Sequence, residues 1–333
     1  MNLIESTVKS GLRSGVLILS IITLFLLLNI YLLTNPLMSS SNNNKPKIPV
    51  NKDRLYADVK ALTSMDPPRN FENISSLNES ADYIFSEFKK LGSDIEVQNY
   101  SVEGSEYKNI ICSFGPQDAP RIIIGAHYDV CGDQPGADDN ASGVAGLLET
   151  GRMINELKPQ LKYRIDLVAY SLEEPPFFRT KYMGSAVHAR SLAKAGIKVK
   201  AMISLEMIGF YRDESGSQHF PLFFLSWFYS DKANFIAVVG KLWQRKIVKQ
   251  IRKSMILGSN IDVYSINAPV LLPGIDFSDH LNYWNYGYQA VMITNTSFFR
   301  NPNYHEITDT IETLNFDKMA EVVKGVYWAM VNM

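Results

Sequence analysis

Residues 121–129 read RIIIGAHYD, and this stretch decides the fold. Its three consecutive isoleucines, Ile122 to Ile124, form a continuous apolar run, which indicates a strand buried on both faces of a sheet. The run ends in His127 and Asp129, whose side chains bind metals and protons. Chemistry in an α/β sheet gathers beyond the carboxyl ends of its strands, so the stretch predicts a central strand with a functional site at its end.

Two further apolar runs end in the same way. The predicted strand 163–170 is followed by Glu173 and Glu174, and the predicted strand 200–205 by Glu206. Carboxylates are rarely buried without partners, because removing a charge from water is costly. A metal ion shared by these side chains would remove that cost.

The elements around these strands alternate between helix and strand, which predicts a three-layer α/β/α sandwich with a mostly parallel central sheet. Residues 211–276 are rich in aromatic side chains, and we interpret them as an insertion that shapes one wall of a pocket. Apolar periodicity predicts helices over 76–91, 142–154, 185–195, 235–251 and 316–330, and strands over 95–100, 109–114 and 289–294.

The amino terminus carries a strong membrane signal. No charged residue occurs between Arg13 and Lys45, and the 18 residues of 16–33 are almost wholly apolar, enough for a helix of about 27 Å. Lys9 and Arg13 precede the run, which by the positive-inside rule keeps the amino terminus cytoplasmic. We therefore divide the chain into a cytoplasmic tail (1–13), a transmembrane signal anchor (14–34), a flexible tether (35–52) and a catalytic domain on the non-cytoplasmic side (53–333). A cleaved signal peptide is the alternative.

Composition narrows the function classes. Lys and Arg number 33 against 34 Asp and Glu, so the chain has no overall positive field to collect nucleic acid. The two cysteines, Cys112 and Cys131, cannot form a disulfide framework, and we expect two separate thiols, with a single disulfide left open. The oligomeric state is not indicated.

The segment GADDNASG at residues 136–143 lies between the first strand and the next helix. Small residues allow a tight turn that would place Asp138 over the strand ends. Taken alone, the segment is more typical of a helix N-cap, and the strand-end acids beside it favour the metal site. His305 follows a turn-rich segment, and zinc favours this combination of histidine nitrogen and carboxylate oxygen.

These motifs occur in an order that resembles metallopeptidase family 28, which includes zinc aminopeptidases, glutamate carboxypeptidases and glutaminyl cyclases. The resemblance covers roughly residues 53–333. It rests on His127-x-Asp129, the GADDNASG segment, Glu173-Glu174, Glu206, the SDH triplet at 278–280 and the NPNYH segment ending at His305.

The resemblance implies two zinc ions bridged by Asp138, with His127 and Glu206 completing one site and Glu174 and His305 the other. Many relatives have Asp where this chain has Glu206, which leaves that metal's identity less certain. Further roles are implied for three acids: Glu173 as general base, Asp129 accepting the second ring N–H of His127, and Asp279 bonding to Glu173 or to the substrate amine.

The function implied by the resemblance is that of an aminopeptidase, which cleaves amino-terminal residues from peptide substrates through a metal-bridging water. Two alternatives stay open. A glutaminyl cyclase would use one zinc ion on the same scaffold, and a non-catalytic ectodomain would keep the fold without turnover.

Overall fold

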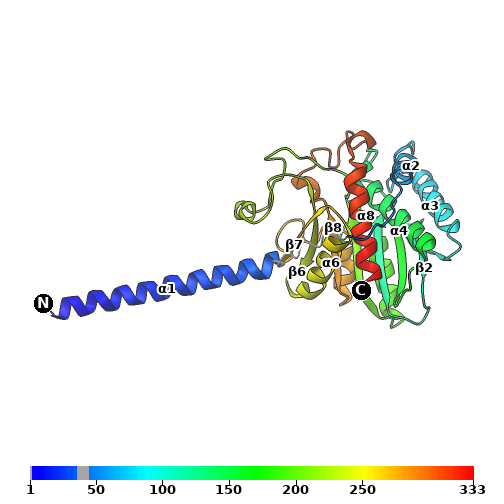
Figure 1. The fold of residues 1–333 in the computed structure, drawn as a ribbon. Coiled ribbons are helices and arrows are strands. Elements are labelled where there is room, and N and C mark those ends of the chain that lie inside the picture. Colours follow the sequence, from blue (N-terminus) through cyan, green and yellow to red (C-terminus); the bar gives the residue numbers. More distant parts are fainter. Residues whose placement is uncertain (1, 36–44) are drawn as a thin grey trace.

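The computed structural model describes residues 2–35 and 45–333, with side chains from residue 13 onward. A long helix, α1 (Asn2–Thr34), leads into a domain with one central sheet (Figure 1). Residues 13–34 form the one helix among the described residues that is long and apolar enough to cross a membrane.

Eight strands form the sheet in the order β1-β2-β4-β3-β5-β8-β6-β7. The central strands β4, β3, β5 and β8 run parallel, as do β6 and β7, whereas β1, β2 and the β6–β8 pair are antiparallel. The bounds are β1 (Asp94–Val102), β2 (Ser105–Phe114), β3 (Arg121–His127), β4 (Arg164–Tyr170), β5 (Val199–Glu206), β6 (Phe235–Lys241), β7 (Asp262–Ala268) and β8 (Ala290–Thr294).

Helices cover both faces of this sheet, which confirms the three-layer α/β/α prediction (Figure 1). One face carries α2 (Lys52–Thr63), α3 (Ile74–Lys89), α4 (Gly143–Leu157), α6 (Arg245–Gly258) and α8 (Phe316–Val331); the other carries α5 (Gly184–Lys194) and α7 (His280–Asn285). Short turns η1 (Ala137–Ser142), η2 (Phe223–Trp227), η3 (Leu242–Gln244), η4 (Ser297–Phe299) and η5 (Ile311–Thr313) lie in the connections.

Strand β3 explains why the apolar run at residues 122–124 is continuous. Ile122 and Ile124 pack into the core beneath α4 and α8, and Ile123 packs into the core on the opposite face. Alternate side chains of a strand point to opposite faces, so a strand covered on both sides needs apolar residues at every position.

The predicted helix over 235–251 is wrong in its first half. Residues 235–241 form β6, which pairs with β7 and β8, and the helix α6 starts only at Arg245. A short apolar run fits a buried strand and a buried helix equally well, and here sheet pairing decides. The insertion predicted over 211–276 thus contributes two strands to the sheet as well as a pocket wall.

The predicted tether over 35–52 is also corrected where the structure describes it. Asn35 is buried and donates from its side-chain amide to the Asn267 side chain, and Ile48 belongs to the main core. Lys45 donates to the backbone oxygen of Ser259. Residues 36–44 lie outside the described part. The domain therefore begins near Lys45 rather than at residue 53.

Candidate metal centre

The strand ends bring the predicted acids and histidines together. His127 is the last residue of β3, Glu206 is the last of β5, and Glu173 and Glu174 follow β4 by three and four residues. His305 approaches from the loop after β8, and its ring stacks on that of Tyr304 with the ring centroids 3.8 Å apart. All of these strands are parallel neighbours, so their carboxyl ends meet at one edge.

The cluster has two halves joined by Asp139. His127 Nε2 lies 3.4 Å from Asp139 Oδ1 and 3.5 Å from Glu206 Oε2. His305 Nε2 lies 3.3 Å from Asp139 Oδ2 and 3.3 Å from Glu174 Oε2. One carboxylate thus faces both histidines through its two oxygens, the arrangement needed for a ligand shared by two ions.

The prediction that Asp138 fills this position is wrong by one residue. Asp138 Oδ1 accepts the backbone N–H groups of Gly209 and Phe210, at 2.8 and 3.2 Å. Its Oδ2 accepts the side-chain amides of Asn295 and Asn301, at 2.8 and 2.9 Å. These bonds turn Asp138 into the protein, where it fastens the loops after β5 and β8.

The loop that carries Asp139 is held by groups outside the motif. The carboxylate of Asp309 accepts the backbone N–H groups of Asp138 and Asp139 at 3.0 to 3.1 Å. Arg69, which is buried, donates 2.7 Å to the Gly136 carbonyl oxygen. The side-chain amide of Asn140 donates 2.8 Å to the Leu205 carbonyl oxygen. Only these tertiary contacts show what Arg69 and Asp309 do, because both lie outside the motif that they support.

Asp129 positions the acids that follow β4. Its carboxylate accepts the backbone N–H groups of Glu173 and Glu174 at 3.1 and 3.0 Å. The contact to His127 differs from the prediction, because Nδ1 lies 3.2 Å from the backbone oxygen of Asp129 and 3.6 Å from its carboxylate. Asp129 therefore links the end of β3 to the residues that follow β4.

The electrostatics of the cluster favour a cation. Burial raises the pKa of Glu173 well above its usual range, and Glu174 and Glu206 add to the rise. Burial likewise raises the pKa of Glu174 to about 7. Although burial also acts on Asp139, its contacts with His127 and His305 lower its pKa below the ordinary value. Carboxylates outnumber histidines here, so a bound cation would relieve their mutual repulsion.

Asp279 lies deeper in the same region. Its carboxylate is fully buried, and burial raises its pKa to about 7, opposed by His127. Neither oxygen meets a hydrogen-bonding partner among the described residues. Its predicted bond to Glu173 or to a substrate amine stays a prediction.

The donor atoms fit a zinc ion. His127 Nε2, His305 Nε2 and Glu174 Oε1 are buried atoms with no hydrogen-bonding partner in the described part of the chain, and all three point into the cluster. Buried polar atoms are normally satisfied, so orphaned ones at a shared point indicate a ligand. Cys131, a free thiol that sequence reasoning assigned to structure, also lies within 4.8 Å of the donor atoms of Glu174 and His305.

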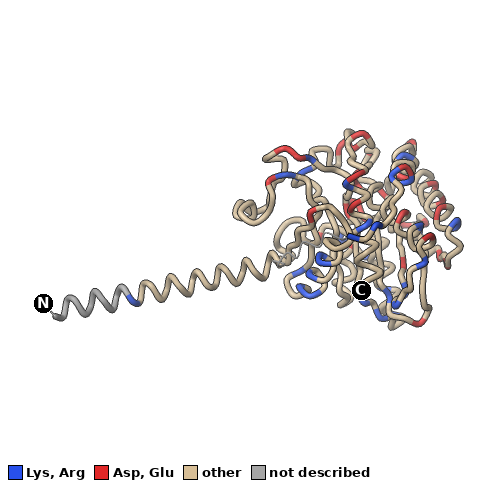
Figure 2. The backbone as a smooth tube through the Cα atoms, viewed as in Figure 1, with Lys and Arg blue, Asp and Glu red and all other residues tan. Residues whose placement is uncertain are grey.

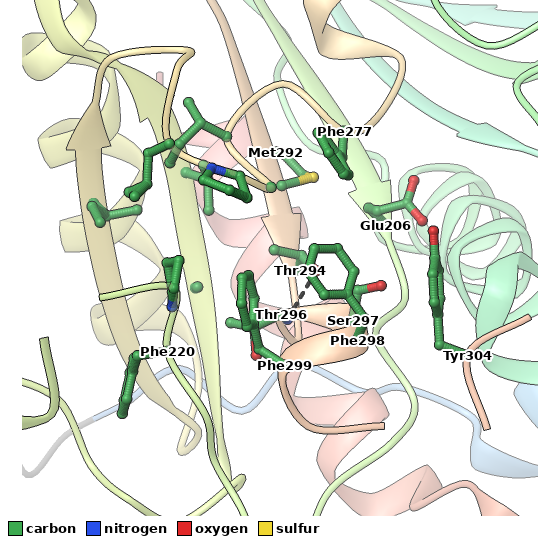
Figure 3. A pocket seen from close by; sticks show the side chains of 18 of the residues that line it. Glu206, Phe220, Phe277, Met292, Thr294, Thr296, Ser297, Phe298, Phe299 and Tyr304 are labelled. Atoms are coloured by element: carbon green, nitrogen blue, oxygen red, sulfur yellow. Dashed lines mark hydrogen bonds between the residues drawn. The ribbon is translucent and has the colours of Figure 1, made fainter. Parts of the chain in front are cut away.

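A largely apolar pocket of about 320 Å³ opens from this cluster. Figure 3 shows Glu206 and Tyr304 at one end in this view, and Phe298, Phe299 and Phe220 along the remainder. Its lining includes strands β6, β7 and β8 and the loops at 218–229 and 272–277, and no Lys or Arg occurs among the described lining residues.

A parallel sheet whose strand ends gather histidines and carboxylates around orphaned donors defines a metal-dependent enzyme of the α/β class. Residues 109–330 match the sequence profile of Peptidase family M28, and the chain belongs to that family. It is a zinc-dependent metallo-exopeptidase, a hydrolase that acts on peptides.

Two relatives match this chain over most of its length. The chain is 48% identical to an uncharacterized Escherichia coli protein, YfbL, over 84% of this chain and 88% of that protein. It is 25% identical to leucine aminopeptidase 1 of Metarhizium robertsii, over 83% of this chain and 71% of the relative.

Two solved structures share the fold. The zinc aminopeptidase BSAP of Bacillus subtilis has a TM-score of 0.68 at 15% identity, covering 86% of this chain and 96% of that one. A glutaminyl cyclase of Bacteroides thetaiotaomicron has a TM-score of 0.63 at 20% identity, covering 87% and 100%. Because both chemistries occur on this fold, the choice between them depends on the site.

Proposed function

We propose that the protein is a two-zinc aminopeptidase that removes apolar amino-terminal residues from peptides. The observation that carries the proposal is the position of Asp139, whose two oxygens face His127 and His305 at 3.4 and 3.3 Å. Asp139, His127 and Glu206 would hold one ion, and Asp139, Glu174 and His305 the other. Both halves have a complete donor set, which favours two ions over the single zinc of a cyclase.

Bound zinc supplies positive charge that polarises the scissile carbonyl and makes a nearby water molecule more acidic. Glu173 is the general base. It stands beside the ligand Glu174, its Oε2 lies 3.9 Å from His127 Nε2, and burial raises its pKa, which suits a group that must accept a proton. The oxygen of water attacks the carbonyl carbon, Glu173 takes its proton, and the same proton passes to the amine as the C–N bond breaks.

The charge of the site supports an aminopeptidase over a carboxypeptidase. Glu173, Glu174 and Glu206 line the pocket where it meets the cluster, and this acidic end suits a peptide's ammonium group, whereas a terminal carboxylate would need a cation. The described pocket lining offers no Lys or Arg for that purpose. The apolar walls suit a large aliphatic or aromatic side chain at the cleaved residue.

Helix α1 supports a membrane-anchored form with the domain on the non-cytoplasmic side, because its apolar span of 22 residues begins at Arg13, whose charge marks the cytoplasmic end. An uncleaved anchor also agrees with the contacts at the end of α1. Arg252 donates to the backbone oxygens of Thr34 and Asn35, so the end of the span is fastened to the domain.

The test is zinc content measured beside activity, using the full chain in detergent. The panel contains leucyl and glutamyl amides, the same substrates with blocked amines, and a peptide with amino-terminal glutamine. Two zinc ions per chain, with cleavage of free leucyl amides only, would support the proposal. One zinc ion with ammonia release from glutamine would identify the protein as a glutaminyl cyclase instead. Two bound ions without turnover on any substrate would favour a non-catalytic ectodomain.

A further inference from the structure

Helix α6 lies where the membrane anchor meets the domain. The guanidinium of Arg245, its first residue, stacks 4.1 Å from the ring centroid of Tyr31 and donates 2.9 Å to the Tyr31 backbone oxygen. Two turns further along, Arg252 donates 2.7 Å to the backbone oxygen of Asn35. These contacts fix α6 beside the last turn of α1.

The position of these contacts sets the height of α6 relative to a bilayer. Tyr31 precedes the end of α1 by three residues, which is about 4.5 Å along the helix axis. The apolar span ends at Leu33 and is followed by Thr34 and Asn35, so the last turn of α1 must lie at the headgroup level. The start of α6 therefore lies at that level too.

Helix α6 is strongly basic. Its sequence, RKIVKQIRKSMILG, holds five basic residues and no acidic one, in a chain whose net charge is -1. None of the five has a carboxylate partner within 4.0 Å in the part of the chain that the structure describes. Figure 2 shows these basic residues beside the junction with α1. Because Arg245 and Arg252 bond to the end of α1, the three lysines of α6 are the cations that remain for anions.

An aromatic side chain adjoins this basic helix. Trp243, two residues before Arg245, is 88% exposed, although tryptophan is usually well buried in a soluble domain. Tryptophan is enriched at membrane interfaces, where its apolar ring and N–H both find suitable surroundings. Lys246 and Lys253 are exposed on the same helix.

We propose that α6 and Trp243 dock the domain onto the surface of the bilayer that holds α1, binding the phosphate groups of anionic phospholipids. The inference rests on the membrane-anchored form proposed above. The partner is a lipid surface because the anchor holds α6 at the level of the headgroups. The docking also fixes the pocket close to the membrane, because β7 contacts the end of α1 and supplies Tyr264, Ser265 and Ile266 to the pocket wall.

The test uses the full chain in nanodiscs of phosphatidylcholine alone or with one part in four phosphatidylglycerol, prepared with brominated acyl chains that quench nearby tryptophan. The Trp243 signal is the difference between the wild type and Trp243→Phe. We expect strong quenching in anionic discs at low salt, and less at high salt, where surface charges are screened.

The variant Lys246→Glu with Lys253→Glu should lower the ratio of docked to undocked protein by about tenfold or more, because each basic residue near an anionic surface contributes about a fivefold factor. The control, Lys60→Glu with Lys89→Glu, makes the same charge change on α2 and α3, at the far end of the domain (Figure 1), and should dock normally. Leucyl amide hydrolysis in the same discs reports on the proposed function separately and should be unchanged in both variants.

Three results would overturn the proposal. Trp243 quenching that is equal in neutral and anionic discs and unaffected by the charge reversal would exclude anionic lipid as the partner. Two chains per disc that separate on charge reversal would identify a second copy instead. Extraction of the wild type from membranes by alkaline carbonate would show that α1 does not span the bilayer, and the docking depends on that span.

Discussion

Adjacent aspartates with opposite roles make the sharpest test of the metal centre. Asp138→Asn replaces one carboxylate oxygen by an NH₂ group, while four N–H donors still point at the two oxygens. Whichever way the new amide faces, at least two buried donors lose their acceptor, at a cost of about 1 to 3 kcal/mol each, or about 2 to 6 kcal/mol of unfolding free energy. For a domain of this size, this corresponds to a fall in melting temperature of roughly 3 to 10 °C.

Asp139→Asn should act on metal binding instead. Asp139 faces His127 and His305 and has no comparable set of donors, so the substitution removes the carboxylate shared by the two halves. Zinc at 100 times its dissociation constant stabilises the folded state by about 2.7 kcal/mol per site. We expect Asp138→Asn to keep this zinc-dependent increment on a lower baseline, and Asp139→Asn to lose it.

The assay is thermal unfolding in excess zinc and in EDTA, together with metal content by mass spectrometry. The wild type supplies the reference for both the baseline and the increment. If Asp139→Asn retained two ions while Asp138→Asn lost them without a change in its metal-free stability, the assignment of Asp139 would be refuted.

Three further predictions address the base, the pocket and the core. Glu173→Gln should keep the wild-type zinc content while kcat falls by about 10²- to 10⁴-fold, and near-normal turnover would remove Glu173 from the base role. Phe298→Ala should lower kcat/KM for leucyl amides by about 10-fold relative to alanyl amides, and an unchanged ratio would show that Phe298 does not contact the cleaved residue. Burial lowers the pKa of His188 to about 4, below its unfolded value of about 6.5, so the unfolded chain binds the proton more readily and stability falls as pH drops from about 6.5 to 4. His188→Gln should therefore recover about 2.5 kcal/mol of the loss between pH 7 and 4.5, measured by urea unfolding in EDTA; an acid sensitivity equal to wild type would contradict this pKa.

Local chemistry predicted much of the molecule. An apolar run such as residues 122–124 allows few states other than a strand covered on both faces, and the polar residues that follow it had to lie at the strand end. That reasoning placed His127, Glu173, Glu174 and Glu206 at one edge, and the family resemblance added His305; the structure brings all five together. Helix α1 was equally evident, because a long uncharged apolar stretch is unstable in water unless it is covered.

Local patterns could not decide between equivalent alternatives. Residues 235–241 have the composition of a buried helix or strand, and the free hydrogen-bonding edge of β8 makes them a strand. The segment from residue 45 looked like a tether because it lacks periodicity, yet Ile48 finds a place in a core assembled from distant elements.

The sequence by itself determined the class of fold, the types of residue that gather at the strand ends and the apolar span of α1, because periodicity and residue type depend only on neighbours along the chain. Only the tertiary structure decided which of two adjacent aspartates faces the histidines. Asp138 and Asp139 have the same side chain, and what separates them is the set of donors that surrounds each one. Backbone and amide N–H groups from the loops after β5 and β8 bond to Asp138, whereas the carboxylate of Asp139 faces the two histidines. Those donors come from residues 71 to 163 positions away in the chain, and their approach is a property of the folded sheet.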